Sequence, residues 1–403
     1  MLIVKKFGGS SVANVERIYN VAKRCIEDYN RGHSVVVVLS AMGDTTDHLI
    51  ELADSVSKRP NKREMDMLLA TGEQVSVALM SMAMQELNVP SISLNAFQVA
   101  MHTTQVHMNS RLKEIDKARI RHELENKKIV IVTGFQGIDK YDDLTTLGRG
   151  GSDTTAVALA AALHADKCEI FTDVEGVYTA DPRIVPDASK LKEISYDEML
   201  EMATLGAKVL HNRSVELARK YSVPLIVRSS LNMEEGTEVK EETRMEKMLV
   251  SGVAADKNTA RVSLVGLKDV PGVAFKVFNC LAKKNINVDM ILQSIGREGT
   301  KDITFTVPRD MLEDSIEALE DSKKSLCFDH VSSKKSVSKV SVIGSGMATN
   351  PGVAAKMFEA LFNAGINIKM ISTSEIRVTV LIEEEETELA VRAIHEAFRL
   401  NEL

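Results

Sequence analysis

The chain has 403 residues, of which 44% are hydrophobic and 27% charged, and its net charge is −7 at neutral pH. This length predicts two or three domains with substantial cores, and the composition is ordinary for a globular protein. The acidic balance, the absence of Trp and an aromatic content of 4% argue against nucleic acid as a partner. Apolar runs such as Val35–Leu39 are far too short to span a membrane, and no signal-peptide pattern opens the chain. We therefore expect a cytoplasmic protein.

The four cysteines stand apart from one another in the sequence, with no C-x-x-C pair: Cys25, Cys168, Cys280 and Cys327. This spacing predicts reduced thiols and neither a zinc site nor a disulfide framework. No two histidines have metal-ligand spacing on one face of an element, so we predict no protein metal site.

The first ten residues combine a short apolar strand with a basic end and a glycine turn, closing on Lys6-Phe7-Gly8-Gly9-Ser10. A helix is expected from Asn14, because apolar residues recur at helical spacing as far as Tyr29. A strand, a glycine turn and a helix converge backbone N–H groups at one point, where a helix N-terminus adds partial positive charge. With the charge of Lys6, this pattern predicts a phosphate site, although a purely structural turn is the alternative. Neither a Walker A loop nor a dinucleotide G-x-G-x-x-G occurs at this turn.

Up to about residue 230, strand-like runs alternate with longer helical patterns. Strands are expected at Val35–Leu39, Ile129–Thr133, Cys168–Thr172 and Pro224–Val227, and helices at Arg63–Leu87 and Ser152–Leu163. This alternation predicts an α/β domain with a largely parallel sheet. A charged, glycine-containing segment, Met233 to Lys247, marks its end, so we assign residues 1–245 to this domain.

A second glycine cluster, Thr145 to Thr154, leads into an alanine-rich helix. It again brings backbone donors to a helix N-terminus, where Ser152 or Asp153 is the expected N-cap. The guanidinium group of Arg149 is well placed to bind a carboxylate through two parallel hydrogen bonds. A capped helix after a flexible loop is the alternative.

Three further features fall in the same half of the chain. The segment Phe171 to Arg183 follows an expected strand, at the edge where open α/β sheets bind ligands. Lys208 adds a cation, with a solvated surface lysine as the alternative. Glu73 sits among apolar neighbours in an expected helix, where a surface position would be usual.

Beyond the boundary the sequence repeats itself at an offset of 80 residues. Pro271-Gly272-Val273-Ala274 recurs as Pro351-Gly352-Val353-Ala354, and Ile286-Asn287 recurs as Ile366-Asn367. Each copy begins with an expected strand, followed by a Pro-Gly turn, a helix and a second strand starting near Ile286 or Ile366. Two βαββαβ units are predicted, at 246–335 and 336–403, with residues 246–258 alternatively paired with the second unit.

Together these segments resemble the aspartate kinase family. The matching motifs begin at Lys6, Ser40, Gly72, Gly134, Leu147, Thr172 and Gly206. The resemblance implies an α/β, three-layer amino-acid-kinase fold with a mainly parallel sheet, followed by two α+β ferredoxin-like ACT domains. It also implies phosphorylation of the β-carboxylate of L-aspartate with ATP and Mg²⁺, giving 4-phospho-L-aspartate. That reaction opens the pathway to lysine, threonine and methionine.

Site roles follow from the resemblance, residue by residue. Lys6 and Asp153 are the implied catalytic pair. The implied aspartate-binding residues are Ser40, Thr45, Thr46, Asp47, Glu73, Arg149, Gly150, Gly151 and Ser152. The implied ATP-binding residues are Lys6, Gly8, Gly9, Ser10, Thr172, Asp173, Tyr178, Asp181, Arg183 and Lys208.

The duplicated half resembles the ACT pairs that sense end-product amino acids, which implies feedback by lysine, threonine or both. The implied effector-binding residues are Asp269, Gly272, Ala274, Asn287, Met290, Ile291, Gln293, Asn367 and Thr373. Gly296 stands where relatives sensing both amino acids often carry serine. The resemblance further implies a homo-oligomer formed through the ACT domains. An internal start near Met245 would produce the regulatory half as a separate chain.

Two other functions compete with this interpretation. One is an amino-acid-kinase-fold enzyme acting on a different acidic substrate. The other is an amino-acid sensor with an inactive kinase half, against which the intact set Lys6, Glu73, Arg149 and Asp153 argues.

Overall fold

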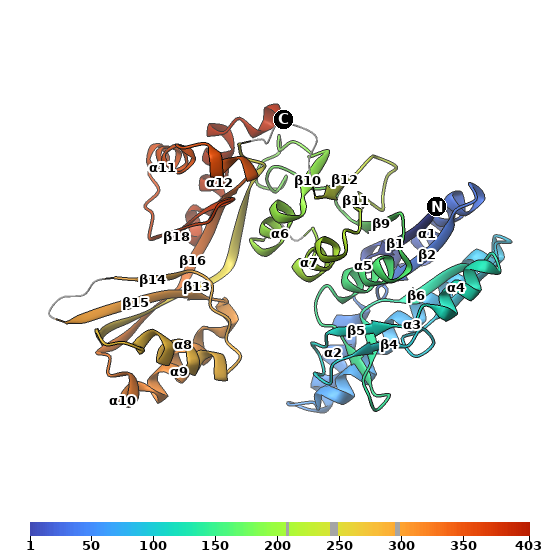
Figure 1. The fold of residues 1–403 in the computed structure, drawn as a ribbon, viewed down its shortest axis with the longest axis horizontal. Coiled ribbons are helices and arrows are strands. Elements are labelled where there is room, and N and C mark those ends of the chain that lie inside the picture. The colour runs from blue at the N-terminus through green and yellow to red at the C-terminus, as the bar shows by residue number, and fades with distance from the viewer. Residues whose placement is uncertain (207–208, 242–248, 295–298) are drawn as a thin grey trace. The chain divides into compact units, whose positions relative to one another are not determined.

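A computed structural model describes residues 1–206, 209–241, 249–294 and 299–403 (Figure 1). The chain divides into two compact units. Unit 1 comprises Met1–Val177, Lys190–Thr204 and Lys208–Glu246, and unit 2 comprises Tyr178–Ser189, Leu205–Ala207 and Lys247–Leu403.

Unit 1 is built on an eight-stranded sheet with the order β10-β12-β11-β9-β1-β2-β6-β3. All neighbouring strands run parallel except β11 and β12. The strands are β1 Leu2–Phe7, β2 Ser34–Leu39, β3 Ser91–Leu94, β6 Ile129–Thr133, β9 Lys167–Thr172, β10 Glu193–Ser195, β11 Leu225–Ser229 and β12 Thr237–Lys240. The four strands expected from the sequence are confirmed, and their β-branched runs are buried because helices cover both faces.

The described residues of unit 1 form seven α-helices. They are α1 Val15–Asn30, α2 Thr45–Val56, α3 Lys62–Glu86, α4 Ala118–Glu125, α5 Gly151–Leu163, α6 Tyr196–Thr204 and α7 Asn212–Tyr221. Helices α1 and α3 pack together, whereas α5 packs on β1, β2 and β9 and against α7. A small sheet of order β5-β4-β7-β8 contains Leu112–Ile115, Met101–Thr103, Gln136–Ile138 and Leu144–Thr146. Among the described helices α3 alone is long and apolar enough to cross a membrane, but 56% of its apolar window is buried, as in a core helix.

Unit 2 contains a six-stranded sheet of order β14-β15-β13-β16-β18-β17 in which every neighbouring pair is antiparallel. The strands are β13 Gly252–Lys268, β14 Ile291–Gln293, β15 Thr300–Val307, β16 His330–Ile343, β17 Met370–Thr373 and β18 Arg377–Glu383. The helices are α8 Val273–Lys283, α9 Leu312–Asp321, α10 Lys323–Leu326, α11 Val353–Asn363 and α12 Thr387–Ala397. Each repeat has its own apolar core, and the long strands β13 and β16 join the repeats into one sheet.

The duplication is visible in the structure. Helices α8 and α11 begin after Gly272 and Gly352, whose φ angles of +87° and +102° only glycine adopts without strain. The second strands, however, begin at Ile291 and Met370, so the expected starts near Ile286 and Ile366 are wrong. Ile286 and Ile366 instead pack into the cores of their repeats immediately after a helix ends, and neither belongs to a strand.

The twelve-residue segment Tyr178–Ser189 leaves unit 1 and folds with unit 2. Ala180 and Val185 are buried in the core of the second repeat. Thr179 Oγ1 lies 2.9 Å from the ring nitrogen Nε2 of the buried His395 on α12, and Arg392 Nε donates to Ile184 O at 2.8 Å. Part of the predicted ATP motif therefore folds with unit 2.

Candidate active site

The glycine turn after β1 packs against the turn after β2. A Cβ atom on Gly9 would lie 2.7 Å from Ala41 O, so only glycine fits at this close approach. Gly43 N donates to Gly9 O at 3.0 Å, and Ser40 N donates to Phe7 O at 3.1 Å. The turn continues as a short 3-10 helix, Gly9–Val12, into α1, whose first turn is capped by Asn14. The predicted strand, turn and helix are confirmed.

Lys6 and Asp153 form an ion pair, with Nζ 2.6 Å from Oδ1 and both side chains 12% exposed. Lys6 stands at the end of β1, and Asp153 lies in the first turn of α5. A lysine ammonium is thus held beside a glycine turn and a helix N-terminus, all of which attract phosphate.

Helix α5 starts earlier than its expected cap. Gly150 is the N-cap, with φ of +66°, and neither Ser152 nor Asp153 caps the helix. Ser152 and Asp153 lie inside the helix, where the Asp153 carboxylate pairs with Lys6. The surroundings are close: a Cβ on Gly150 would lie 2.2 Å from the ring of His211, and one on Gly134 would lie 2.5 Å from Ser152 Oγ. The helix N-terminus therefore lies directly against the turn after β6.

Glu73 is a buried carboxyl group on α3, 3% exposed. Its Oε1 accepts a hydrogen bond from Ala41 N at 3.2 Å, while Oε2 has no hydrogen-bond partner within the described part of the chain. Burial raises the pKa of Glu73 to about 7. A buried carboxylate oxygen with spare acceptor capacity is suited to a ligand cation such as an ammonium group.

Arg149 is exposed between Gly148 and Gly150, in a loop that other side chains hold in place. Arg213 on α7 donates to Leu147 O at 2.5 Å and to Ser110 O at 2.9 Å. Nearby, the buried Asp66 accepts hydrogen bonds from Thr146 Oγ1 and Met108 N. Arg213, His211 and Asp66 belong to no sequence motif that places them near this loop, and only the fold brings them close to it.

The remaining aspartate-side residues lie next to the glycine turn. Ser40 directly follows β2, and Thr45, Thr46 and Asp47 form the first turn of α2. Thr45 Oγ1 donates to Met42 O at 2.5 Å, which closes the loop. The structure thus gathers the segments following β1 and β2 at one edge of the sheet.

The predicted ATP residues fall into three groups. Thr172 ends β9, the strand beside β1, and Asp173 follows it, while Gly8 N donates to Phe171 O at 3.4 Å. Tyr178, Asp181 and Arg183 belong to the segment that folds with unit 2, where Arg183 pairs with Asp181 at 2.7 Å. Lys208 lies outside the described residues.

The predicted effector residues lie at helix starts and edge strands of unit 2. Gly272 is the N-cap of α8, Ala274 lies in its first turn, and Asp269 pairs with Lys301 at 2.7 Å. Asn287, Ile291, Gln293, Asn367 and Thr373 are exposed on or just before the edge strands β14 and β17. Met290 differs, because it is 3% exposed and clusters with Met370, its counterpart in the second repeat. Gly296 lies outside the described residues.

Comparisons with known proteins define the class first. Residues 1–229 match the amino acid kinase family, and residues 262–322 and 340–398 match the ACT domain. The protein is therefore an amino-acid kinase that carries a regulatory ACT pair.

Full-length relatives narrow this class. The chain is 52% identical over 401 residues to an aspartokinase of Bacillus sp. (strain MGA3), covering 99% of this chain and 98% of the relative. It is 51% identical over 401 residues to aspartokinase 2 of Bacillus subtilis (strain 168), with the same coverage. The structure of E. coli aspartokinase III in complex with aspartate and ADP matches with a TM-score of 0.85 and 28% identity, covering 98% of this chain and 99% of that one. The chain belongs to the aspartokinase family, and it phosphorylates the β-carboxylate of L-aspartate at the expense of a nucleoside triphosphate in a regulated reaction.

Proposed function

We propose that Lys6 bridges the β- and γ-phosphates of ATP while the amides of Gly8, Gly9 and Ser10 cradle them. Asp153 orients Lys6 for this role. The observation that supports this assignment is the Lys6–Asp153 ion pair, which places a cation where the glycine turn meets the N-terminus of α5. Thr172 and Asp173, at the end of the neighbouring strand, bind the nucleotide, together with Tyr178, Asp181, Arg183 and Lys208.

On the other side of the reaction, Glu73 pairs with the ammonium group of aspartate and Arg149 with its α-carboxylate. The burial of Glu73 and its unbonded Oε2 support the first assignment. The two glycines that flank Arg149 support the second, because the loop passes so close to Met108 and His211 that a larger residue at either glycine would be crowded, which fixes the backbone on both sides of Arg149. Gly150, Gly151 and Ser152 contribute amides and a hydroxyl there, and Ser40 with Thr45, Thr46 and Asp47 completes the aspartate side.

Phosphoryl transfer depends mainly on in-line positioning and on neutralising negative charge. The β-carboxylate of aspartate is ionised at neutral pH, so the reaction needs no general base. Lys6, Arg149 and the N-terminus of α5 supply positive charge, which reduces the electrostatic repulsion between the carboxylate of aspartate and the triphosphate. The product is the acyl phosphate 4-phospho-L-aspartate.

ATP would be used with Mg²⁺. The described residues hold no group of three or more His, Cys, Asp or Glu side chains arranged for a metal ion. Mg²⁺ usually binds through phosphate oxygens and water, with only one or two carboxylates, and this mode fits a site of this kind. When bound, the ion would neutralise phosphate charge.

Regulation is assigned to the ACT pair, with lysine, threonine or both as effectors. E. coli aspartokinase III, which matches with a TM-score of 0.77 and 28% identity, is known in complex with lysine and aspartate. The N-terminus of α8 at Gly272 offers free amides to an amino-acid carboxylate, and exposed amide side chains at Asn287, Gln293 and Asn367 offer further hydrogen bonds.

We also propose a homo-oligomer formed through the ACT domains, in the cytoplasm. The edge strands β14 and β17 expose Ile291, Leu292 and Ile371, and an exposed apolar edge is a template for pairing with another chain. The four cysteines are free, as expected in a reducing compartment. A separately translated regulatory half remains a prediction, and Met245 lies outside the described residues.

The test is ADP release by the purified chain with ATP, Mg²⁺ and L-aspartate, with lysine and threonine added singly and together. Aspartate-dependent turnover that an effector lowers is the expected result. Turnover only with another acidic substrate would assign the site to a different amino-acid kinase. Effector binding without turnover on any substrate would indicate a sensor.

A further inference from the structure

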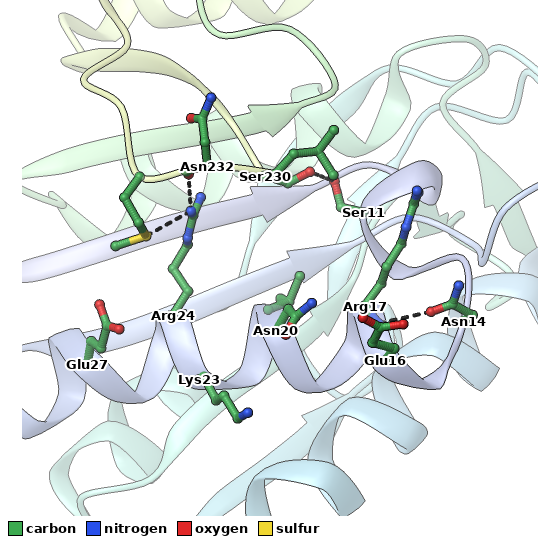
Figure 2. Close-up of a pocket in the computed structure, with 13 residues that line it drawn as sticks. Ser11, Asn14, Glu16, Arg17, Asn20, Lys23, Arg24, Glu27, Ser230 and Asn232 are labelled. Carbon is green, nitrogen blue, oxygen red and sulfur yellow. Dashed lines mark hydrogen bonds between the residues drawn. The ribbon is translucent and has the colours of Figure 1, made fainter.

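Arg24, on the third turn of α1, reaches away from its helix to the loop that follows β11. Its Nη1 donates to the carbonyl oxygen of Ser229, the last residue of β11, at 2.7 Å. Its Nη2 donates to Asn232 O in the loop, as Figure 2 shows. A cavity of about 550 Å³ lies between α1 and this loop, and Arg24 forms part of its wall. Two carbonyl groups, one at the end of β11 and one in the loop after it, are thus fixed by a single guanidinium from a helix far away in the sequence.

The loop that Arg24 holds is bonded in turn to the ends of two other strands. Ser230 N donates to Thr172 O at 2.9 Å, where β9 ends. Ser11 Oγ donates to Ser230 Oγ at 2.8 Å, from the turn after β1 (Figure 2). Asn232 Nδ2 donates to Glu175 Oε1 at 2.7 Å. The C-terminal ends of β1, β9 and β11 are therefore connected by hydrogen bonds through the loop to which Arg24 is bonded.

Arg24 also acts on the strands beneath these exits. Its guanidinium carbon lies 5.0 Å from the centre of the Phe171 ring, within cation–π range. Phe171 is stacked on Phe7, with ring centres 4.4 Å apart. Phe171 directly precedes Thr172, and Phe7 directly precedes Gly8. Arg24 therefore packs against the aromatic pair at the ends of the two strands that lead into the predicted phosphate-binding segments.

We infer that Arg24 is a positioning residue for the nucleotide half of the reaction. It makes no contact with Glu73 or Arg149 among its described bonds. The segment that it bonds carries no assigned nucleotide residue itself, but it is bonded to Ser11 and Thr172, which belong to the nucleotide-side segments after β1 and at the end of β9. This inference rests on the proposed nucleotide roles of Gly8, Gly9, Ser10 and Thr172. Its physical basis is that the rate of a catalysed reaction depends steeply on the position of the binding groups: displacement of one such group by about 1 Å can lower the rate by about 100-fold.

The test uses the full-length chain and four variants. Arg24→Met keeps the stem over Phe171 but removes every donor, and Arg24→Lys keeps the charge but cannot bond both carbonyls. Ser230→Ala removes the link from β1 to the same loop. Lys23→Met is the matched control, because Lys23 is the exposed neighbour on α1 that lines the same cavity. Each protein is assayed for KM with ATP, KM with aspartate and kcat, and for ADP binding by calorimetry without aspartate.

Arg24→Met should raise the KM for ATP and the Kd for ADP about tenfold or more and leave the KM for aspartate within about twofold. Arg24→Lys and Ser230→Ala should give smaller changes in the same direction, and Lys23→Met should match the wild type. Equal changes in both KM values, or a lower melting temperature with unchanged KM values, would overturn the inference. If Arg24→Met does not fold, Arg24→Lys and Ser230→Ala decide by the same criterion. Failure of the wild type to bind ADP would instead contradict the proposed nucleotide site.

Discussion

The ammonium nitrogen of Lys6 lies 2.6 Å from Asp153 Oδ1, so an ion pair joins the end of β1 to the first turn of α5. Both partners are nearly enclosed, which makes the pair more than a surface contact, since low solvent access strengthens the attraction. The pair holds the lysine chain in one direction before any phosphate arrives. Preorganised charge of this kind needs no rearrangement when negative charge develops during transfer.

Lys6→Ala should lower kcat by about 1,000-fold or more, because it removes the charge that we propose bridges the transferring phosphates. The same protein should still bind lysine or threonine in calorimetry, since the proposed effector residues belong to unit 2. Lys23→Ala, an exposed lysine on α1, is the control. Activity near that of the wild type in Lys6→Ala would show that the phosphate site has been misassigned.

Glu73 predicts a pH dependence of aspartate binding. Its pKa of about 7 means that the free enzyme loses the carboxylate as the pH falls, and only the carboxylate pairs with an ammonium group. The kcat/KM for aspartate should therefore decline below about pH 7, whereas Glu73→Gln should be slow at every pH and lack this limb. Measuring kcat/KM from pH 5.5 to 9 for both proteins checks this. If the decline in kcat/KM below about pH 7 is the same in Glu73→Gln as in the wild type, the titrating group is not Glu73.

Glu73 also predicts a pH dependence of stability. The folded chain holds this proton more tightly than the unfolded chain does, where the pKa is 4.5. The free energy of unfolding should therefore fall as the pH rises from about 4.5 to about 7 and then level off, by about 3 kcal/mol for this residue. Glu73→Gln should remove that decline and gain stability relative to the wild type at pH 8. Urea unfolding at pH 5 and pH 8 measures the difference, and identical pH slopes in the two proteins would refute it.

Gly150 should tolerate no side chain. Gly150→Ala forces an L-residue to a φ of +66° and drives its Cβ to 2.2 Å from the His211 ring. Gly32→Ala is a matched control, because Gly32 also has a positive φ of +84° but nothing lies within 4 Å of its Cβ position. We expect Gly32→Ala to lose about 1 kcal/mol and Gly150→Ala clearly more, in chemical denaturation. Equal losses would mean that the helix start can move away from His211.

Gln293 tests the effector site. Gln293→Ala should weaken inhibition by lysine or threonine by about tenfold in effector concentration, since an effector loses one side-chain hydrogen-bond partner. Asn363→Ala, an exposed amide at the end of α11, serves as the control. Inhibition curves at saturating substrates give the comparison. An unchanged curve for Gln293→Ala alongside effective inhibition of the wild type would move the effector away from β14.

Much of the fold could be predicted because its signals are local. The β-branched runs at β2, β6 and β9 and the glycine turn after Phe7 specify strands and a turn through their own residues. The 80-residue repeat predicted both α8 and α11, since each starts at a glycine with positive φ. The starts of β14 and β17 were predicted too early in the chain. Ile286 and Ile366 are β-branched, as strand residues often are, but they pack into the cores of their repeats just after a helix ends.

The site could be predicted only in part. Its motifs gave the residue types, yet the expected cap at Ser152 or Asp153 was wrong, because capping propensity does not show that α5 already begins at Gly151 and that Asp153 pairs with Lys6 on a distant strand. Arg24, Asp66 and Arg213 carry no motif at all. Their roles consist of bonds to backbone carbonyls or to side chains remote in the sequence, which no local pattern encodes.

The sequence by itself determined the order of strands, turns and helices, the duplicated regulatory half and the chemical types present in the site, because each of these depends on neighbouring residues. Only the tertiary structure decided that Glu73 is buried with a raised pKa, that Lys6 pairs with Asp153, and that Tyr178–Ser189 folds with the regulatory unit. These properties depend on solvent exclusion and on contacts across the fold, and both arise only when distant segments pack together.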